Sequence, residues 1–280
     1  MKRSWVLWLF AFLITAASAV YQRRTGPTYP VAGRADVGGA VIRYELARSH
    51  SSASDYSVRI ETRDPSIEGA LIWKRHKTSD AWRRVPMTYR DGALSAGLPH
   101  QPPAGKLDYS VELSTSAARA TLPTSGPIVI RFRGDVPNPI LVVHVLGIFG
   151  AMLVSTRAGL EALAGRPALK QYTLWTVGFL LIGGMILGPV VQKYAFGAFW
   201  TGWPLGHDLT DNKTAVAFLA WLAAWAALGR AKNPRRWIEG AAIVTLAAFL
   251  IPHSVLGSEL DYSKMPAPGD QPTAPATPPA

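Results

Sequence analysis

The chain has 280 residues, with 29 Lys and Arg against 18 Asp and Glu, 49% apolar residues and no cysteine. The absence of cysteine excludes disulfide frameworks, zinc fingers, thiol nucleophiles, iron–sulfur ligation and covalent CxxCH haem attachment. Charged residues make up 17% of the chain, which is low against the roughly 25% typical of soluble globular proteins. The composition therefore favours a membrane protein.

Five apolar stretches reach or approach the roughly 20 residues that a membrane-spanning helix needs. They predict an N-terminal helix and, after a long polar region, a membrane domain of four α-helices over residues 137–257. The stretches are Trp5–Val20, Pro139–Thr156, Thr173–Val191, Lys213–Leu228 and Ile238–Leu256.

Residues 1–20 fit two interpretations. Lys2 and Arg3, an apolar core and a small-residue site at 17–19 match a signal peptide. Trp5 at one interface and Arg23 just past the other end match a retained anchor equally well. We prefer the anchor, and the other four spans do not depend on the choice.

The basic residues of the short loops predict the orientation in the bilayer, because cytoplasmic loops carry an excess of Lys and Arg. All of these residues fall on one side. Residues 21–136, the loop 192–212 and the C-terminal tail are then extracytoplasmic, in a multi-pass protein of the cytoplasmic membrane. The nine residues are Lys2, Arg3, Arg157, Arg166, Lys170, Arg230, Lys232, Arg235 and Arg236.

The net charge of +11 does not indicate nucleic-acid binding. Much of the excess belongs to the cytoplasmic loops, and the 17 basic residues of the outer domain are scattered among 11 acidic ones. A solvated surface explains this pattern better than a polyanion site.

Residues 21–136 predict an extracytoplasmic all-β domain. Apolar and polar residues alternate along several short segments, as in half-buried antiparallel strands. Asp91-Gly92 is a strong hairpin signal. About seven strands in roughly 100 residues favour an immunoglobulin-like sandwich. The predicted strands are 40–47, 56–61, 69–74, 82–89, 93–98, 108–113 and 128–133.

This β-domain contains no catalytic constellation, and its His50, His76 and His100 are isolated in the sequence. It is interpreted as a structural or partner-binding module, and nothing in the chain favours an enzyme. The short junction from Gly134 to Pro139 should hold the domain close to the membrane. Residues 258–280 are assigned to a disordered, Pro-rich tail.

Two histidines lie in predicted spans, where an ionisable side chain usually marks a function. His144 is about five residues into the second span and His253 is three residues before the end of the fifth. At about 1.5 Å per helical residue, both belong to the outer third of the bilayer. Purely structural roles are the alternatives. His144 would form a hydrogen bond to a neighbouring helix, and His253 would donate to the backbone carbonyl that Pro252 leaves without a helical donor.

The loop between the third and fourth spans is rich in aromatic residues. Tyr194, Phe196, Phe199, Trp200 and Trp203 fall within ten residues, beside three glycines. Asp208 and Asp211 follow and are able to cap the next helix; capping is the preferred explanation for Asp211, and Asp208 is left open. Gly184-x-x-x-Gly188 predicts a packing face, and Gly188-Pro189 predicts a kink or an end of the third span.

This arrangement resembles the haem-handling membrane proteins of cytochrome c assembly, in which a tryptophan-rich outer loop (the WWD motif) is flanked by two histidines that ligate haem iron. The resemblance covers residues 137–256. It implies haem b, with His144 and His253 as axial ligands and Phe196, Trp200, Trp203 and Asp208 as the platform. Phe196 replaces the leading Trp of the motif, and extra residues separate Trp203 from Asp208.

The sequence thus predicts haem binding at the outer leaflet, for haem handling or electron transfer. The alternative is a non-enzymatic membrane subunit that binds an extracytoplasmic or membrane protein through its β-domain. A non-haem metal site made by His144, His207, His253 and Asp208 is a weaker reading, because no HxxH or HxxxH pair supports it.

Overall fold

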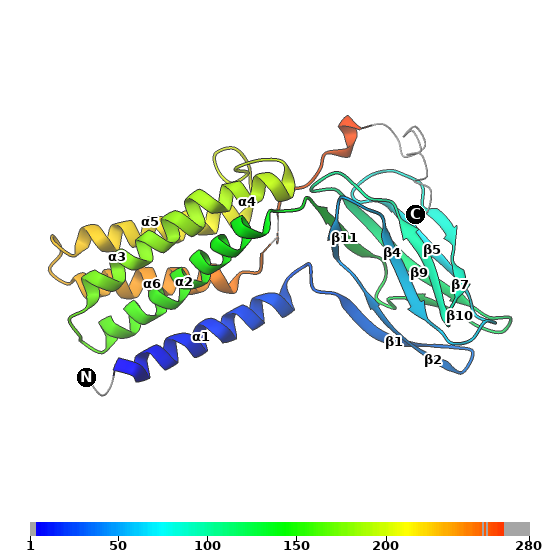
Figure 1. The fold of residues 1–280 in the computed structure, drawn as a ribbon, viewed down its shortest axis with the longest axis horizontal. Coiled ribbons are helices and arrows are strands. Elements are labelled where there is room, and N and C mark those ends of the chain that lie inside the picture. Colours follow the sequence, from blue (N-terminus) through cyan, green and yellow to red (C-terminus); the bar gives the residue numbers. More distant parts are fainter. Residues whose placement is uncertain (1–3, 254, 256, 266–280) are drawn as a thin grey trace.

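The computed structural model describes residues 4–253, 255 and 257–265. Helices and strands separate into two regions that meet end to end along the long axis of the molecule (Figure 1). The helices are α1 (Ser4–Thr25), α2 (Asn138–Leu163), α3 (Leu169–Phe179), a π-helical turn (Leu180–Ile186), α4 (Leu187–Phe196), α5 (Leu209–Ala227) and α6 (Pro234–Leu250).

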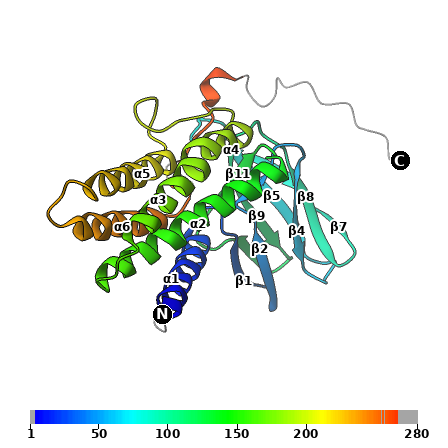
Figure 2. The same ribbon diagram turned by 60° about the vertical axis from the view of Figure 1, so that its left-hand side comes forward.

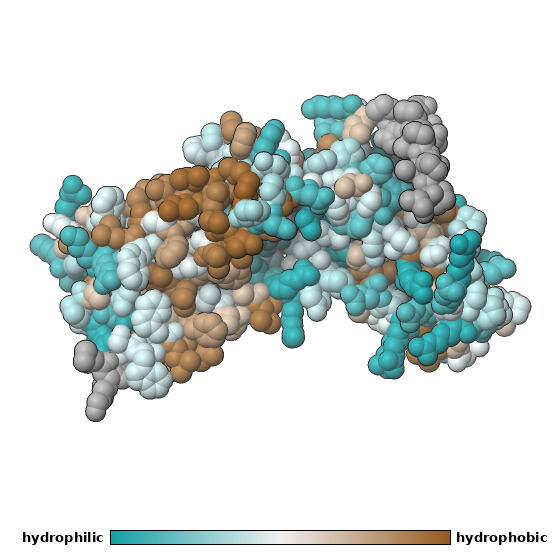
Figure 3. Space-filling view, viewed as in Figure 1, coloured by the Kyte–Doolittle hydropathy of each residue, from teal (hydrophilic) through white to brown (hydrophobic). Residues whose placement is uncertain are grey.

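Within the described residues, three helical segments are long and apolar enough to cross a membrane. They are α1, α2 and the continuous run Leu169–Phe196, which joins α3, the π-helical turn and α4. Apolar side chains form a band over the bundle, and polar ones gather at its far end and over the β-domain (Figure 3). The chain is therefore compatible with a membrane protein. The shorter helices α5 and α6 pack against one another and against this group.

The helix α1 continues through the small-residue site at 17–19 and packs along α2 and α6 (Figure 2). Near the start of α1, the ring centre of Trp8 lies 5.5 Å from the guanidinium of Arg157 in α2, which is also 4.6 Å from the ring centre of Tyr172. Near its end, Gln22 donates a 2.7 Å hydrogen bond to the Phe249 carbonyl. Both ends of α1 are thus tied to the bundle.

Arg157 forms a buried ion pair with Glu161, one helical turn further along α2. Nη1 of Arg157 lies 2.6 Å from Oε2 of Glu161, and the two side chains are 1% and 4% exposed. The span expected to end at Thr156 therefore continues to Leu163. Neutralisation of its charge within the bundle is what allows Arg157 to lie inside the helix rather than in a loop.

Glycines allow α2 and the π-helical turn to approach closely. A Cβ on Gly183 would lie 2.8 Å from the carbonyl carbon of Gly147, and one on Gly184 would lie 2.8 Å from Cγ2 of Thr214 in α5. The small-residue packing face is thus present at Gly184. The helix does not end at Gly188-Pro189; it widens into the π-helical turn just before these residues and continues to Phe196.

We expect Gly183→Ala to destabilise the protein by roughly 1–3 kcal/mol, because the added methyl group meets backbone atoms that are unable to move aside cheaply. Gly178→Ala, in the preceding α3, is the matched control, because a Cβ there meets none of the described atoms within 4 Å. It should be neutral or stabilising by about 0.5–1 kcal/mol. Thermal unfolding in detergent measures both, and equal midpoints would contradict the close approach.

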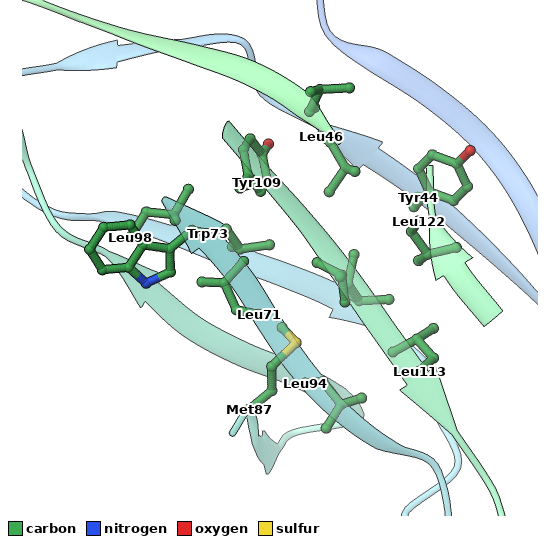
Figure 4. Packing of buried hydrophobic residues seen from close by; sticks show 14 of the residues in the cluster. Tyr44, Leu46, Leu71, Trp73, Met87, Leu94, Leu98, Tyr109, Leu113 and Leu122 are labelled. Carbon is green, nitrogen blue, oxygen red and sulfur yellow. The ribbon is translucent and has the colours of Figure 1, made fainter. Parts of the chain in front are cut away.

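The β-domain contains three sheets that enclose one apolar core (Figure 4). A six-stranded sheet has the order β3-β11-β9-β5-β6, with β10 also paired to β9; the other sheets are β1-β2 and β4-β8-β7. The strands are β1 (Val31–Val37), β2 (Ala40–Leu46), β3 (Ser49–Ser51), β4 (Tyr56–Glu61), β5 (Glu68–Arg75), β6 (Arg83–Pro86), β7 (Thr88–Arg90), β8 (Ala93–Leu98), β9 (Lys106–Ser114), β10 (Arg119–Leu122) and β11 (Ile128–Arg133).

All seven predicted strands are present, and one of them is divided. The predicted strand 82–89 forms β6, which pairs with β5, and β7, which pairs with β8 in another sheet. The chain changes sheet at Met87, whose amide donates to the Gly69 carbonyl. The predicted hairpin joins β7 to β8, with positive φ at both Asp91 (49°) and Gly92 (75°), as a type I′ turn requires.

The β-domain is fixed to the bundle by two segments. At the junction, the Gly134 amide donates a 2.9 Å hydrogen bond to the Ala195 carbonyl at the end of α4. After α6, residues 257–265 return over the β-domain, where Glu259 contacts Lys77 and Lys106 at 2.7 and 2.6 Å. Burial acts to raise the pKa of Glu259, but hydrogen bonds from these two lysines lower it to about 2.

The assignment of residues 258–280 to a disordered tail is therefore wrong for 258–265. This segment includes a short 3₁₀ turn, Tyr262–Lys264, and the Tyr262 hydroxyl accepts from the Lys106 amide at 2.8 Å. A buried tyrosine and paired charges supply the interactions that its composition did not suggest. Residues 266–280 lie outside the described part of the chain.

Candidate functional site

A cavity of about 140 Å³ lies where the helical bundle meets the β-domain. Its walls come from α2, the π-helical turn, α4, α5, the end of α6 and strand β11, so residues far apart in the sequence meet there. The lining residues include His144, Ile148, Leu180, Gly184, Gly188, Val191, Phe196, Trp200, Asp208, Asp211, Lys213, Ala217, Ala248, Phe249, His253 and Arg131.

Five of the six site residues named from the sequence line this cavity: His144, Phe196, Trp200, Asp208 and His253. Trp203 does not. It is 74% exposed, and its carbonyl accepts a 3.2 Å hydrogen bond from Nε1 of Trp200.

His144 is half-buried on α2, and its orientation is fixed by the π-helical turn. Nδ1 lies 2.8 Å from the Gly183 carbonyl oxygen. A carbonyl only accepts hydrogen bonds, so Nδ1 carries the proton and Nε2 of the neutral ring keeps its lone pair. His144 therefore offers a nitrogen that is able to accept a hydrogen bond or bind a metal ion. The contact also agrees with the structural alternative of a hydrogen bond to a neighbouring helix.

His253 lies three residues beyond the end of α6, not inside a span. The helix α6, which corresponds to the fifth predicted span, ends at Leu250, and Ile251 is extended with ψ 118°. The residue before a proline is sterically driven out of the helical region, and Pro252 imposes that here. His253 is exposed and lies within electrostatic range of His144, Lys213 and Asp208. The two imidazoles are thus neighbours at one cavity.

Asp208 and Asp211 have roles different from those expected. Asp208, not Asp211, caps α5, because its Oδ1 accepts from the Thr210 amide at 2.8 Å. Its other oxygen accepts from the Ser258 amide at 2.9 Å, which joins the C-terminal segment to the site. Asp211 faces back toward the loop and accepts from the amides of Thr201 and Gly202 at 2.7 and 3.0 Å.

Two cationic residues of the cavity were not predicted from the sequence. Arg131 of β11 is 5% exposed and its guanidinium lies 4.2 Å from the ring centre of Phe196. Lys213 of α5 is 8% exposed and donates to the Ile251 carbonyl. The alternation along residues 128–133 predicts that Arg131 lies on the polar face of its strand. It is buried instead, because β11 ends against the bundle, while Arg133 on the same face is exposed. The short junction after Arg133 was the one sequence signal that the end of β11 would lie against the bundle.

Nε of Arg131 has no hydrogen-bond partner among the described residues. Its Nη2 donates to the Ser258 carbonyl, and Asp208 and Glu259 are its acidic neighbours. A buried donor without a partner destabilises a protein by about 1–3 kcal/mol. Arg131 lines the cavity, so this unpartnered donor belongs to a residue of the cavity wall.

The two histidines of the cavity are suitable ligands for a porphyrin iron, but the cavity is too small for the porphyrin ring. Two imidazoles, one of them oriented by a backbone carbonyl, are suitable axial ligands for iron. A cavity of about 140 Å³ is close to the roughly 150 Å³ that holds one benzene ring, and pockets for drug-sized ligands measure about 300–1,000 Å³. Arg131 also covers one face of Phe196, and Trp203 points elsewhere. In this arrangement the site does not enclose haem.

The non-haem metal site considered from the sequence is not supported. In the described part of the chain, no group of three His, Asp or Glu side chains is placed to hold an ion. His207 does not line the cavity. The β-domain histidines also lie apart from it: His76 contacts Asp108 and His100 contacts Asp55, each at 2.7 Å. His76 and His100 are therefore paired with carboxylates rather than isolated.

In comparisons with known proteins, the chain matches no protein-family model and no curated protein sequence.

Proposed function

We propose that the chain is a multi-pass protein of the cytoplasmic membrane that binds a small ligand at the outer end of its helical bundle, between His144 and His253. In this proposal α5 and α6 span the membrane beside α1, α2 and the run Leu169–Phe196, and α1 is retained as an anchor. The β-domain, an immunoglobulin-like sandwich, the loop 192–212 and the C-terminal segment are extracytoplasmic.

The observation that carries this proposal is the shared cavity. His144 comes from α2 and His253 from the segment after α6, and both line the same space together with the buried Arg131. A buried donor without a hydrogen-bond partner, such as Nε of Arg131, is unfavourable, and a histidine within an apolar helix, such as His144, is rare outside functional sites. Their convergence supports ligand binding rather than a purely structural role.

The test is the ligand content of protein purified from native membranes. The wild-type protein should yield a ligand in its absorption spectrum or organic extract, and His144→Ala/His253→Ala should lose it. His207→Ala is the control, because His207 is exposed and outside the cavity lining. Equal ligand content in all three proteins, or none in any, would contradict the proposal.

Haem is the second candidate, implied by the sequence resemblance and favoured by the free Nε2 of His144. It requires the loop 192–212 to move away from the bundle, since the cavity does not enclose a porphyrin. A Soret band in the purified wild-type protein, absent from the double variant, would identify it. A colourless preparation after expression with ample haem would exclude it.

A non-enzymatic partner subunit is the third candidate. Phe199, Trp203 and Leu205 are 57%, 74% and 76% exposed on the loop beside the β-domain, which favours contact with another membrane or extracytoplasmic protein, or with the lipid interface. This function predicts a co-purifying protein that is lost in Trp203→Ser and retained when both histidines are replaced.

A further inference from the structure

We infer that the ligand of this cavity is a single-ring quinol, the reduced headgroup of a membrane-dissolved redox lipid. This inference rests on the proposed function and adds the chemical class of the ligand. Its first support is size, because about 140 Å³ accommodates one six-membered ring and is small for a fused or macrocyclic system.

The walls of the cavity suit an apolar ring. Five different helical segments supply aliphatic and aromatic surface, through Ile148, Leu180, Val191, Ala217 and Phe249. Small residues keep the space open, since Gly184 and Gly188 also line it. Pockets for small molecules combine such walls with a few placed polar groups.

The polar groups fit a molecule with one hydroxyl donor and a second oxygen. Nε2 of His144 accepts, because Nδ1 is committed to the Gly183 carbonyl. Arg131, another lining residue, is a buried donor whose Nε has no partner in the described part of the chain. The two residues belong to opposite regions, the bundle and the β-domain. A quinol is able to donate one hydroxyl to His144 while its other oxygen accepts from Arg131.

The charges of the cavity favour a neutral ligand. Arg131 and Lys213 are balanced by Asp208 and Asp211, and Asp208 lies within electrostatic range of both cations. An added anion or cation would leave a charge uncompensated in a buried site, which is unfavourable. A protonated quinol adds none.

The experiment is a titration of the detergent-solubilised full chain with 2,3-dimethyl-1,4-benzoquinol, a single-ring quinol without bulky substituents, under argon, followed by calorimetry. Ala248→Leu fills the cavity, and Ala247→Leu adds the same groups to the neighbouring exposed position. Overpacking of this kind should weaken binding by at least about tenfold in Ala248→Leu and by less than about twofold in Ala247→Leu. The dimethyl ether of the quinol, which has no hydroxyl to donate, should not bind.

A second pair of variants keeps the test decisive if Ala248→Leu fails to fold. Arg131→Met removes the buried donor, and Arg133→Met changes an exposed arginine of the same strand. The inference predicts loss of quinol binding only in Arg131→Met. Equal quinol binding in wild type and both cavity variants would overturn it. Binding of haemin without binding of quinol would overturn it while the proposed function stands; absence of any ligand would remove both.

Discussion

Replacing Glu161 by alanine is expected to lower the free energy of unfolding by about 3–5 kcal/mol, because it leaves the Arg157 guanidinium buried without its counter-charge. The pair is 2.6 Å apart and almost fully buried, and Oε1 of Glu161 also accepts from the Ala168 amide at 3.3 Å. The loss should be visible in thermal or denaturant unfolding in detergent.

The double variant Arg157→Met/Glu161→Met is the control for this prediction. Apolar residues of similar volume often replace a buried ion pair with little loss of stability, so the double variant should be closer to wild type than Glu161→Ala. Two outcomes would show that the ion pair is not the main determinant of stability at this end of the bundle. Glu161→Ala could unfold like wild type, or the double variant could lose as much unfolding free energy as Glu161→Ala.

Replacing Asp208 by alanine is expected to lower the free energy of unfolding by about 3 kcal/mol, from the lost helix cap together with the uncompensated cations nearby. Asp208 caps α5, holds the Ser258 amide and neighbours both Arg131 and Lys213. Asp208→Asn should lose roughly half as much, because asparagine is as good a cap as aspartate but carries no charge.

Asp261→Ala is the matched control for the cap. Asp261 also caps a helical turn, with Oδ1 accepting from the Ser263 amide at 3.1 Å, but its side chain is 55% exposed. Its removal should destabilise by less than about 1 kcal/mol. Similar losses for Asp208→Ala and Asp261→Ala in the same unfolding assay would show that Asp208 has no role beyond capping.

The sequence predicted the strands and helices well where one local rule decided the outcome. Alternation predicted β4 and β11, and Asp91-Gly92 predicted the β7–β8 turn with its two positive φ values. The same alternation failed at Arg131, because periodicity predicts an exposed position there and the contact with the bundle buries it. The Gly-containing β1 and the short strands β3 and β10 gave too weak a pattern to predict.

The candidate site was predicted in its residues but not in its geometry. His144 and His253 were identified as polar residues in apolar segments, but the end of α6 before Pro252 was missed, although the steric rule for residues that precede proline was sufficient to find it. Arg131, Lys213 and the Ser258 contact to Asp208 depend on how two regions pack together, which no local pattern encodes. The resemblance to haem-handling proteins drew on the same residues without information on the size of the cavity.

The most direct test of the central claim is whether the side chains at positions 144 and 253 meet. The chain contains no cysteine, so His144→Cys/His253→Cys introduces the only two thiols. A short, rigid bismaleimide added to native membranes should link them, and cleavage in the loop 192–212 should then leave the two fragments joined. Val143→Cys/His253→Cys is the comparison, because Val143 is 52% exposed and outside the cavity lining. Linked fragments from the first pair alone are the expected result, whereas equal linkage from both pairs, or none from the first, would contradict the shared cavity.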